Sequence, residues 1–169
     1  ELAKQYGISG FNYYFYWFGG TILMDTPLEA MLKNPAVDIP FCLTWANENW
    51  TRRWDGAEHD VLIAQEHSAN DSRAFIVHLL KYFEDERYIK IDGKPVLCVY
   101  RVDIIPDILA TVALWRQEVM DAGFPGVYLV CAQTFGVVSP IDFSFDAAME
   151  FPPHTVKSAE YRRYYEFTN

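Results

Sequence analysis

The strongest constraint on the fold is the alternation of apolar, strand-like runs with amphipathic helical patterns along the chain. The runs are nearly continuous in apolar residues, which is typical of strands covered on both faces. They predict strands at residues 8–17, 39–44, 96–100, 127–132 and 145–149. Strands that alternate with helices pair in parallel through right-handed crossovers. The sequence therefore predicts an α/β fold in the form of a partial (β/α)8, or TIM-type, barrel of about five parallel strands, since a whole barrel needs about 250 residues.

Two predicted helices have recognisable start signals. The motif Thr26-Pro27-Leu28-Glu29 reads as a capping box with proline at the first helical position, and the helix is expected to stop before Pro35. Either Asn70 or Asp71 is expected to cap the next helix, whose apolar face extends to Phe83.

A third helical stripe covers residues 105–120 and is closed by Gly123. Before it, Asp92-Gly93 predicts a tight turn that leads into a strand. The stretch between Thr134 and Phe145 is short for a crossover helix, so residues 136–144 are expected to form a bare loop.

Charge and hydropathy restrict the partners. The chain has 14 basic and 23 acidic residues and a net charge of −9, which disfavours nucleic acid and anionic membranes. No apolar stretch approaches the roughly 20 residues that a membrane-spanning helix needs. We therefore expect a carbohydrate partner, with no nucleic acid and no membrane span.

The cysteines point to a reducing compartment. Cys42, Cys98 and Cys131 lie singly in apolar runs without metal or disulfide spacing, so we expect reduced core residues and a cytoplasmic location. The chain opens at Glu1 without a methionine, so we expect residues 1–169 to be one incomplete domain of a longer protein. Expressed alone, such a domain is expected to be poorly soluble and inactive.

Two predicted strands end in mixed polar and aromatic clusters, at residues 45–55 and 150–154. Aromatic faces take the apolar side of a sugar ring, and amides, arginines and carboxylates take its hydroxyls. Because sites of such folds lie at the carboxyl ends of the strands, these clusters predict a sugar site. The predicted substrate-binding residues are Tyr14, Tyr16, Trp45, Asn47, Glu48, Asn49, Trp50, Arg52, Trp54, Arg101, Gln133, Glu150 and His154.

Several roles stay open at this stage. Glu48 and Glu150 suit the carboxylate pair of a glycosidase, or they bind hydroxyls or form ion pairs with neighbouring arginines such as Arg101. Each aromatic residue of the clusters is either a stacking platform or part of the core. His154 either binds sugar or is an ordinary loop residue.

Metal and phosphate chemistry lack support in the sequence. His59, Glu66 and His67 do not have recognisable ligand spacing, so no metal site is predicted. Glu84-Asp85-Glu86 ends a helix on a charged face, and no glycine loop that would cradle phosphate is present. We expect no cofactor.

The motifs resemble a known family. Residues 10–17, 44–54, 92–96 and 150–154 are similar to the WbsX family, often named glycosyltransferase WbsX and described as glycoside-hydrolase-family-99-like. The similarity spans nearly the whole chain, and the tryptophan-rich motif Thr44-Trp45-Ala46-Asn47-Glu48-Asn49-Trp50 is the most specific part.

The resemblance implies a (β/α)8 barrel from bacterial surface-polysaccharide loci, such as those for O-antigen. The related family 99 enzymes are retaining endo-acting α-mannosidases without a nucleotide cofactor, and their working glutamates lie in a late Asn-Glu-Trp-x-Glu-Gly motif. This chain has no such motif, so Glu48 and Glu150 carry over as site residues only. A nucleotide-sugar-dependent glycosyltransferase and a non-catalytic sugar-binding module are the alternatives.

Overall fold

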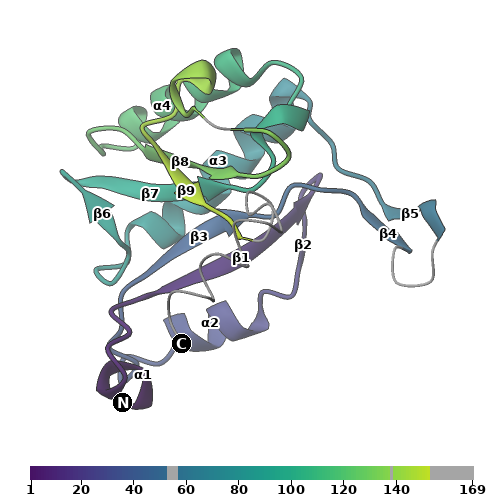
Figure 1. Ribbon diagram of the computed structural model, residues 1–169. Helices are drawn as coiled ribbons and strands as arrows, with labels where there is room; N and C mark the ends of the chain where they lie inside the picture. Colours follow the sequence, from purple (N-terminus) through teal and green to yellow (C-terminus); the bar gives the residue numbers. More distant parts are fainter. Residues whose placement is uncertain (53–56, 138, 153–169) are drawn as a thin grey trace, which may run out of the picture.

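The computed structural model describes residues 1–52, 57–137 and 139–152. Its centre is a sheet in the order β2-β1-β3-β7-β8-β9, in which β2 is the short edge strand Thr21–Leu23 (Figure 1). Successive parallel pairings join β1 to β3, β3 to β7, β7 to β8 and β8 to β9, so the prediction of five parallel strands is confirmed. These parallel strands are β1 (Phe11–Phe18), β3 (Phe41–Trp45), β7 (Lys94–Val99), β8 (Tyr128–Gln133) and β9 (Ala147–Glu150).

Three longer helices lie between the parallel strands: α2 (Thr26–Leu32), α3 (Ala69–Phe83) and α4 (Ile108–Asp121). A short helix, α1 (Leu2–Gln5), precedes β1. Figure 1 shows α3 and α4 side by side over one face of the sheet. None of the helices in the described ranges is both long and apolar enough to cross a membrane.

The predicted helix caps were wrong by one to three residues. The N-cap of α2 is Asp25 rather than Thr26, and no side-chain capping bond forms there. The N-cap of α3 is Ser68, whose Oγ accepts a hydrogen bond of 3.1 Å from the backbone N–H of Asp71. An oxygen three residues before the bonded N–H is the usual capping geometry, so Asp71 receives a cap rather than providing one.

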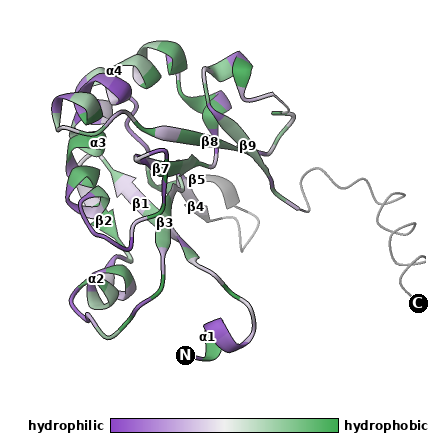
Figure 2. Cartoon of the chain, turned by 90° about the vertical axis from the view of Figure 1, so that its left-hand side faces the viewer, coloured by the Kyte–Doolittle hydropathy of each residue, from purple (hydrophilic) through white to green (hydrophobic). Residues whose placement is uncertain are grey.

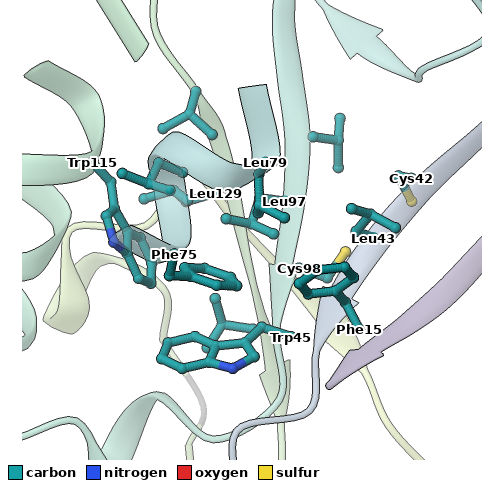
Figure 3. Close-up of a cluster of buried hydrophobic side chains, with 14 of the residues drawn as sticks. Phe15, Cys42, Leu43, Trp45, Phe75, Leu79, Leu97, Cys98, Trp115 and Leu129 are labelled. Atoms are coloured by element: carbon teal, nitrogen blue, oxygen red, sulfur yellow. The ribbon is translucent and has the colours of Figure 1, made fainter. Parts of the chain in front are cut away.

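The core lies between the sheet and the pair α3–α4. Trp45 stacks on Phe75 with 4.4 Å between ring centroids, and Trp115 meets Trp45 edge-on at 5.8 Å (Figure 3). Each of these side chains is fully buried. Figure 2 shows the matching pattern, with hydrophobic residues along β8 and β9 and a mixture of both kinds on α3 and α4. This burial is the main stabilising contribution, at about 1.5–3 kcal/mol for each large apolar side chain.

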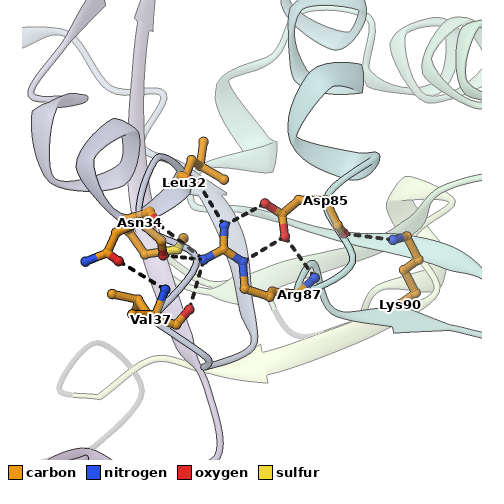
Figure 4. Close-up of polar contacts among 8 residues, drawn as sticks. Leu32, Asn34, Val37, Asp85, Arg87 and Lys90 are labelled. Carbon is orange, nitrogen blue, oxygen red and sulfur yellow. Dashed lines mark hydrogen bonds and ion pairs between the residues drawn. The ribbon is translucent and has the colours of Figure 1, made fainter.

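The side chain of Arg87, which follows α3, binds the end of α2 and the loop after it. The guanidinium of Arg87 donates to the carbonyls of Met31, Leu32, Asn34 and Val37 and forms an ion pair of 2.8 Å with Asp85 (Figure 4). The carbonyls at the end of a helix have no partner within the helix, so this side chain satisfies them.

Of two predicted connections, the turn at Asp92-Gly93 is confirmed and the loop at residues 136–144 is only partly a bare loop. The Asp92-Gly93 turn joins β6 (Lys90–Ile91) to β7 as an antiparallel hairpin, with positive φ at both turn residues, as predicted. The loop expected at residues 136–144 contains a turn of 3-10 helix, Ile141–Phe143.

The long segment after β3 was predicted only as a polar insertion. It holds an antiparallel hairpin of β4 (Trp50–Arg52) and β5 (Ala57–Ile63). In Figure 1 this hairpin extends away from the main sheet. The other small strand, β2 (Thr21–Leu23), pairs with the end of β1. The three cysteines are free and buried in β3, β7 and β8.

Candidate functional site

A cavity of about 230 Å³ opens at the carboxyl ends of the parallel strands. β1 contributes two lining residues, and the segments directly after β3, β7 and β9 contribute most of the others. This is the edge of the sheet where α/β folds bind ligands. The lining residues are Tyr14, Tyr16, Ala46, Glu48, Asn49, Trp50, Tyr100 and Phe151.

Aromatic rings form most of the cavity wall. Tyr14 and Tyr16 alternate along β1 and therefore share one face of the strand, where their rings stack at 6.3 Å. Trp50 meets Tyr16 edge-on at 5.3 Å. Among the lining residues that follow β7 and β9, the ring centroids of Tyr100 and Phe151 lie 5.1 Å apart. Burial and the neighbouring Tyr16 raise the pKa of Tyr14, which stays a neutral hydroxyl that both donates and accepts hydrogen bonds.

One carboxylate, that of Glu48, is among the lining residues. Its Oε1 accepts a hydrogen bond of 2.6 Å from Nη1 of Arg101. The ion pair with Arg101 was one of the alternatives that the sequence left open for Glu48. Both side chains are mostly shielded from water, with 28% of Glu48 and 15% of Arg101 exposed. The pair orients the carboxylate at the cavity.

Hydrogen bonds and one ring contact fix the position of Arg101. Its Nε and Nη2 each donate to a carboxylate oxygen of Asp103 at 2.8 Å, and its guanidinium lies 3.8 Å from the ring centre of Phe135. Asn47 fixes the backbone, because its amide accepts from the N–H of Arg101 at 2.8 Å and donates to its carbonyl at 2.7 Å. The hydrogen bonds to Asp103 raise the pKa of Arg101, and Arg101 in turn lowers the pKa of Asp103.

The base of the β4–β5 hairpin is fastened beside the cavity. Oδ1 of Asn49 accepts a hydrogen bond of 2.6 Å from the backbone N–H of Gln65, and the Gln65 side chain donates to the carbonyl of Glu48 at 3.4 Å. Trp50 is the first residue of β4, so these bonds restrain the ring that it presents to the cavity.

Five of the predicted site residues line this cavity together. They are Tyr14, Tyr16, Glu48, Asn49 and Trp50. A further prediction placed Glu150 and His154 in the same pocket. Glu150 pairs with Gln133, another predicted contact, at the same edge of the sheet. Glu150 and Gln133 are not among the residues that line the cavity.

Three predicted contact residues have other positions. Trp45 was named as a substrate contact, with a core position as the alternative, and it is completely buried in the core, because β3 extends one residue further than expected and turns this ring toward Phe75. Asn47 is also fully buried, and its amide is used by the backbone of Arg101. Arg101 itself lies behind Glu48 rather than among the lining residues.

Three other predictions lie wholly or partly outside the described residues. Trp54 and His154 fall outside them entirely. Arg52 ends β4, and its side chain also lies outside the description.

Four residues of the site region were not among the predicted substrate-binding residues. Tyr100 and Phe151 line the cavity. The sequence carried a signal for both, because Tyr100 ends the strand predicted at residues 96–100 and Phe151 belongs to the predicted cluster at residues 150–154. Asp103 and Phe135 hold Arg101 and had no such signal.

His67, one of the residues weighed for metal, packs against Trp45 at 5.8 Å between ring centroids. Burial lowers the pKa of His67. Within the described ranges, no group of three or more histidine, cysteine or acidic side chains is arranged to hold a metal ion.

Comparison with known families gives one match over nearly the whole chain. The family model described as Glycosyltransferase WbsX matches residues 1–168. Two curated relatives, both called WxcX and both from Xanthomonas campestris pv. campestris (strains B100 and ATCC 33913), are 44% identical over 154 residues. The match covers 91% of this chain and 22% of each relative, so the chain spans less than a quarter of their length.

A solved structure of a glycoside hydrolase-like protein has a similar fold. It superposes with a TM-score of 0.64 at 17% identity, over 97% of this chain and 52% of that protein. At this identity the similarity concerns the fold alone. Together with the parallel sheet, it confirms the prediction of an α/β fold in the form of a partial barrel.

Proposed function

The chain belongs to the Glycosyltransferase WbsX family, and we propose that it supplies the sugar-binding part of a carbohydrate-active site. In this proposal the longer protein acts on glycosidic bonds of bacterial surface polysaccharide, during its synthesis or processing. The single observation that carries the proposal is the cavity in which Tyr14, Tyr16 and Trp50 surround the carboxylate of Glu48.

The chemistry of this cavity suits a sugar ring. The C–H face of a pyranose packs on aromatic rings, and a carboxylate accepts hydrogen bonds from sugar hydroxyls. Glu48 accepts from Arg101 with one oxygen, and we assign hydroxyl binding to the remaining acceptor capacity of this carboxylate. The aromatic walls would hold the ring, and Glu48 would select its orientation.

We assign binding and orientation of the sugar to this chain, and not cleavage of the bond. A glycosidase needs one carboxyl group that donates a proton and a second that acts as base or nucleophile. Oε1 of Glu48 is already bonded to Arg101, so we assign this carboxylate to binding and not to proton transfer. Glu150 is the other carboxylate at this edge of the sheet that the sequence nominated, and we keep it as a substrate contact.

The test is calorimetric titration of the full-length protein with oligosaccharides prepared from the surface polysaccharide of the source bacterium. The variant is Trp50→Ala, and the matched control is Tyr6→Ala, since Tyr6 is an aromatic residue that is 79% exposed and is not part of the cavity. We expect Trp50→Ala to weaken binding about 10- to 100-fold, because burial of one large apolar side chain contributes on the order of 1.5–3 kcal/mol.

The control variant is expected to bind like the unmodified protein. Equal binding by Trp50→Ala and the unmodified protein, with both folded, would remove the cavity from the proposal. Binding without any turnover by the full-length protein would favour the alternative of a sugar-binding module.

A second candidate is a nucleotide-sugar-dependent glycosyltransferase, which the family description favours. Titration of the same protein with uridine and guanosine diphosphate distinguishes it, because a donor site binds the diphosphate moiety on its own.

We further propose a cytoplasmic location, because the three cysteines are free and buried, as is usual in a reducing compartment.

A further inference from the structure

We propose that Asp103 and Phe135, neither of which lines the cavity, make the site selective for uncharged sugar rings over uronic acids. This inference rests on the proposed function, since it concerns the sugar that the cavity accepts. It assigns a specificity-determining role to two residues through their contacts with Arg101.

The donor edge of Arg101 is occupied by protein. A guanidinium binds a carboxylate best through two parallel N–H bonds. Asp103 takes this place, with Nε and Nη2 of Arg101 each 2.8 Å from one of its two oxygens. Nη1 is bonded to Glu48 at 2.6 Å. A carboxylate on a substrate would therefore have to displace Asp103 or Glu48 to reach this cation.

The flat face of Arg101 is covered as well. The ring of Phe135 lies 3.8 Å from the guanidinium carbon. Phe135 has a φ of +49°, a conformation that costs energy for any residue other than glycine. The turn is anchored by Thr134, which is fully buried and donates from Oγ1 to the carbonyl of Tyr100 at 2.9 Å. The backbone is thus held in a strained shape that keeps the ring over the cation.

The charges around Arg101 do not cancel. One guanidinium is bonded to two carboxylates, those of Glu48 and Asp103. In the described part of the chain, Glu48 is the one carboxylic acid among the cavity-lining residues, and none of them is a lysine or arginine. Among the lining residues that the structure describes, the carboxylate of a uronic acid would meet the Glu48 carboxylate and no lysine or arginine, and like charges repel. A neutral ring would instead offer hydroxyl donors to Glu48.

The experiment measures the affinity of the full-length protein for matched pairs of methyl glycosides. Each pair differs only at C6, as in glucoside and glucuronide, galactoside and galacturonide, and mannoside and mannuronide. For the sugar that binds, we expect the neutral member to bind at least about tenfold more tightly at low ionic strength.

Asp103→Asn is the main variant. It leaves Arg101 with one carboxylate instead of two, so we expect the ratio of the affinity for the uronic acid to that for its neutral partner to rise about tenfold. Asp103→Glu restores the charge and is expected to return the preference to that of the unmodified protein. Asp142→Asn is the matched control, since Asp142 is an exposed acidic residue in the 3-10 turn Ile141–Phe143 and does not line the cavity.

Phe135→Ala provides a second, independent variant should Asp103→Asn not fold, as judged by circular dichroism. It uncovers the face of Arg101 without removing an ion-pair partner, and it is expected to shift the preference in the same direction by a smaller factor.

The outcomes separate this inference from the proposed function. Failure of every neutral glycoside and every uronic acid to bind would overturn both. Binding in which the uronic acid equals or exceeds its neutral partner would overturn the selectivity alone. So would an unchanged preference in folded Asp103→Asn, or in folded Phe135→Ala where the first variant is unfolded.

Discussion

At the scale of single residues, two tryptophans of one short segment have opposite environments. Trp45 is fully buried and stacks on Phe75, whereas Trp50 is partly exposed and lines the cavity. They are close in the sequence: Trp45 is the last residue of β3, and Trp50 is the first residue of β4. Trp45 belongs to the central sheet and points into its core, whereas Trp50 belongs to the separate β4–β5 hairpin and lines the cavity. This difference separates a residue that stabilises the fold from one that we assign to the ligand.

This difference predicts different stability effects. Trp45→Ala removes a buried ring with its contacts to Phe75 and Trp115, so we expect a loss of about 3–5 kcal/mol in the free energy of unfolding. Trp50→Ala is expected to cost about 1 kcal/mol, because a partly exposed ring buries less apolar area. Urea denaturation followed by circular dichroism measures both. A cost for Trp50→Ala that equals that of Trp45→Ala would show that Trp50 is structural.

At the scale of elements, one side chain links the end of α2 to the segment after α3. Arg87 satisfies carbonyl groups at the end of α2 and in the following loop, and it is itself paired with Asp85. A single planar cation with several donors connects pieces of chain that are more than 50 residues away in sequence. Lysine has the same charge but not the forked donor geometry.

We therefore expect both Arg87→Ala and Arg87→Lys to destabilise the protein, by about 2–4 kcal/mol for the alanine variant and somewhat less for lysine. Arg73→Ala is the matched control. Arg73 forms an ion pair with Glu118 but is 63% exposed, and such pairs contribute less than about 1 kcal/mol. Thermal or urea unfolding decides the comparison, and equal losses for Arg73→Ala and Arg87→Ala would contradict the role given to Arg87.

At the scale of the whole molecule, stability should depend on pH in two separate windows. Burial lowers the pKa of His67 and, as the largest of several causes, that of His78. Both histidines thus bind protons more readily in the unfolded chain, where the pKa is about 6.5. Their contribution is present above this value and is lost as the pH falls below it, because protonation favours the unfolded state.

The second window is acidic. Hydrogen bonds from Arg87 and Arg101 lower the pKa of Asp85 and Asp103, respectively. Their contribution is present above the unfolded pKa of about 3.9 and is lost as the pH falls toward the lower folded value.

Urea denaturation between pH 7.5 and 3 measures both windows. We expect the free energy of unfolding to decrease below pH 6.5, with a slope of at most about 1.4 kcal/mol per pH unit for each histidine. The double variant His67→Gln, His78→Gln should flatten this part of the curve and leave the acidic part unchanged. An unchanged slope in the folded double variant would show that these histidines are not the cause.

The sequence alone determined the order and type of the main elements. Five apolar runs became five parallel strands, and the helical stripes ending at Phe83 and Met120 became α3 and α4. These features follow from local periodicity and turn chemistry, which act over a few neighbouring residues. Exact caps were missed, since Ser68 and Asp25 compete with neighbouring residues that have similar capping oxygens.

Only the tertiary structure decided which residues meet at the cavity. The sequence nominated the segment 45–54 as a whole, but one additional strand residue turns Trp45 into the core, because side chains alternate between the faces of a strand. The contact of Phe135 with Arg101 likewise depends on a distant turn, which is anchored by a hydrogen bond between Thr134 and Tyr100, 34 residues apart. Contacts between distant segments arise from the packing of the whole sheet, and no local pattern records them.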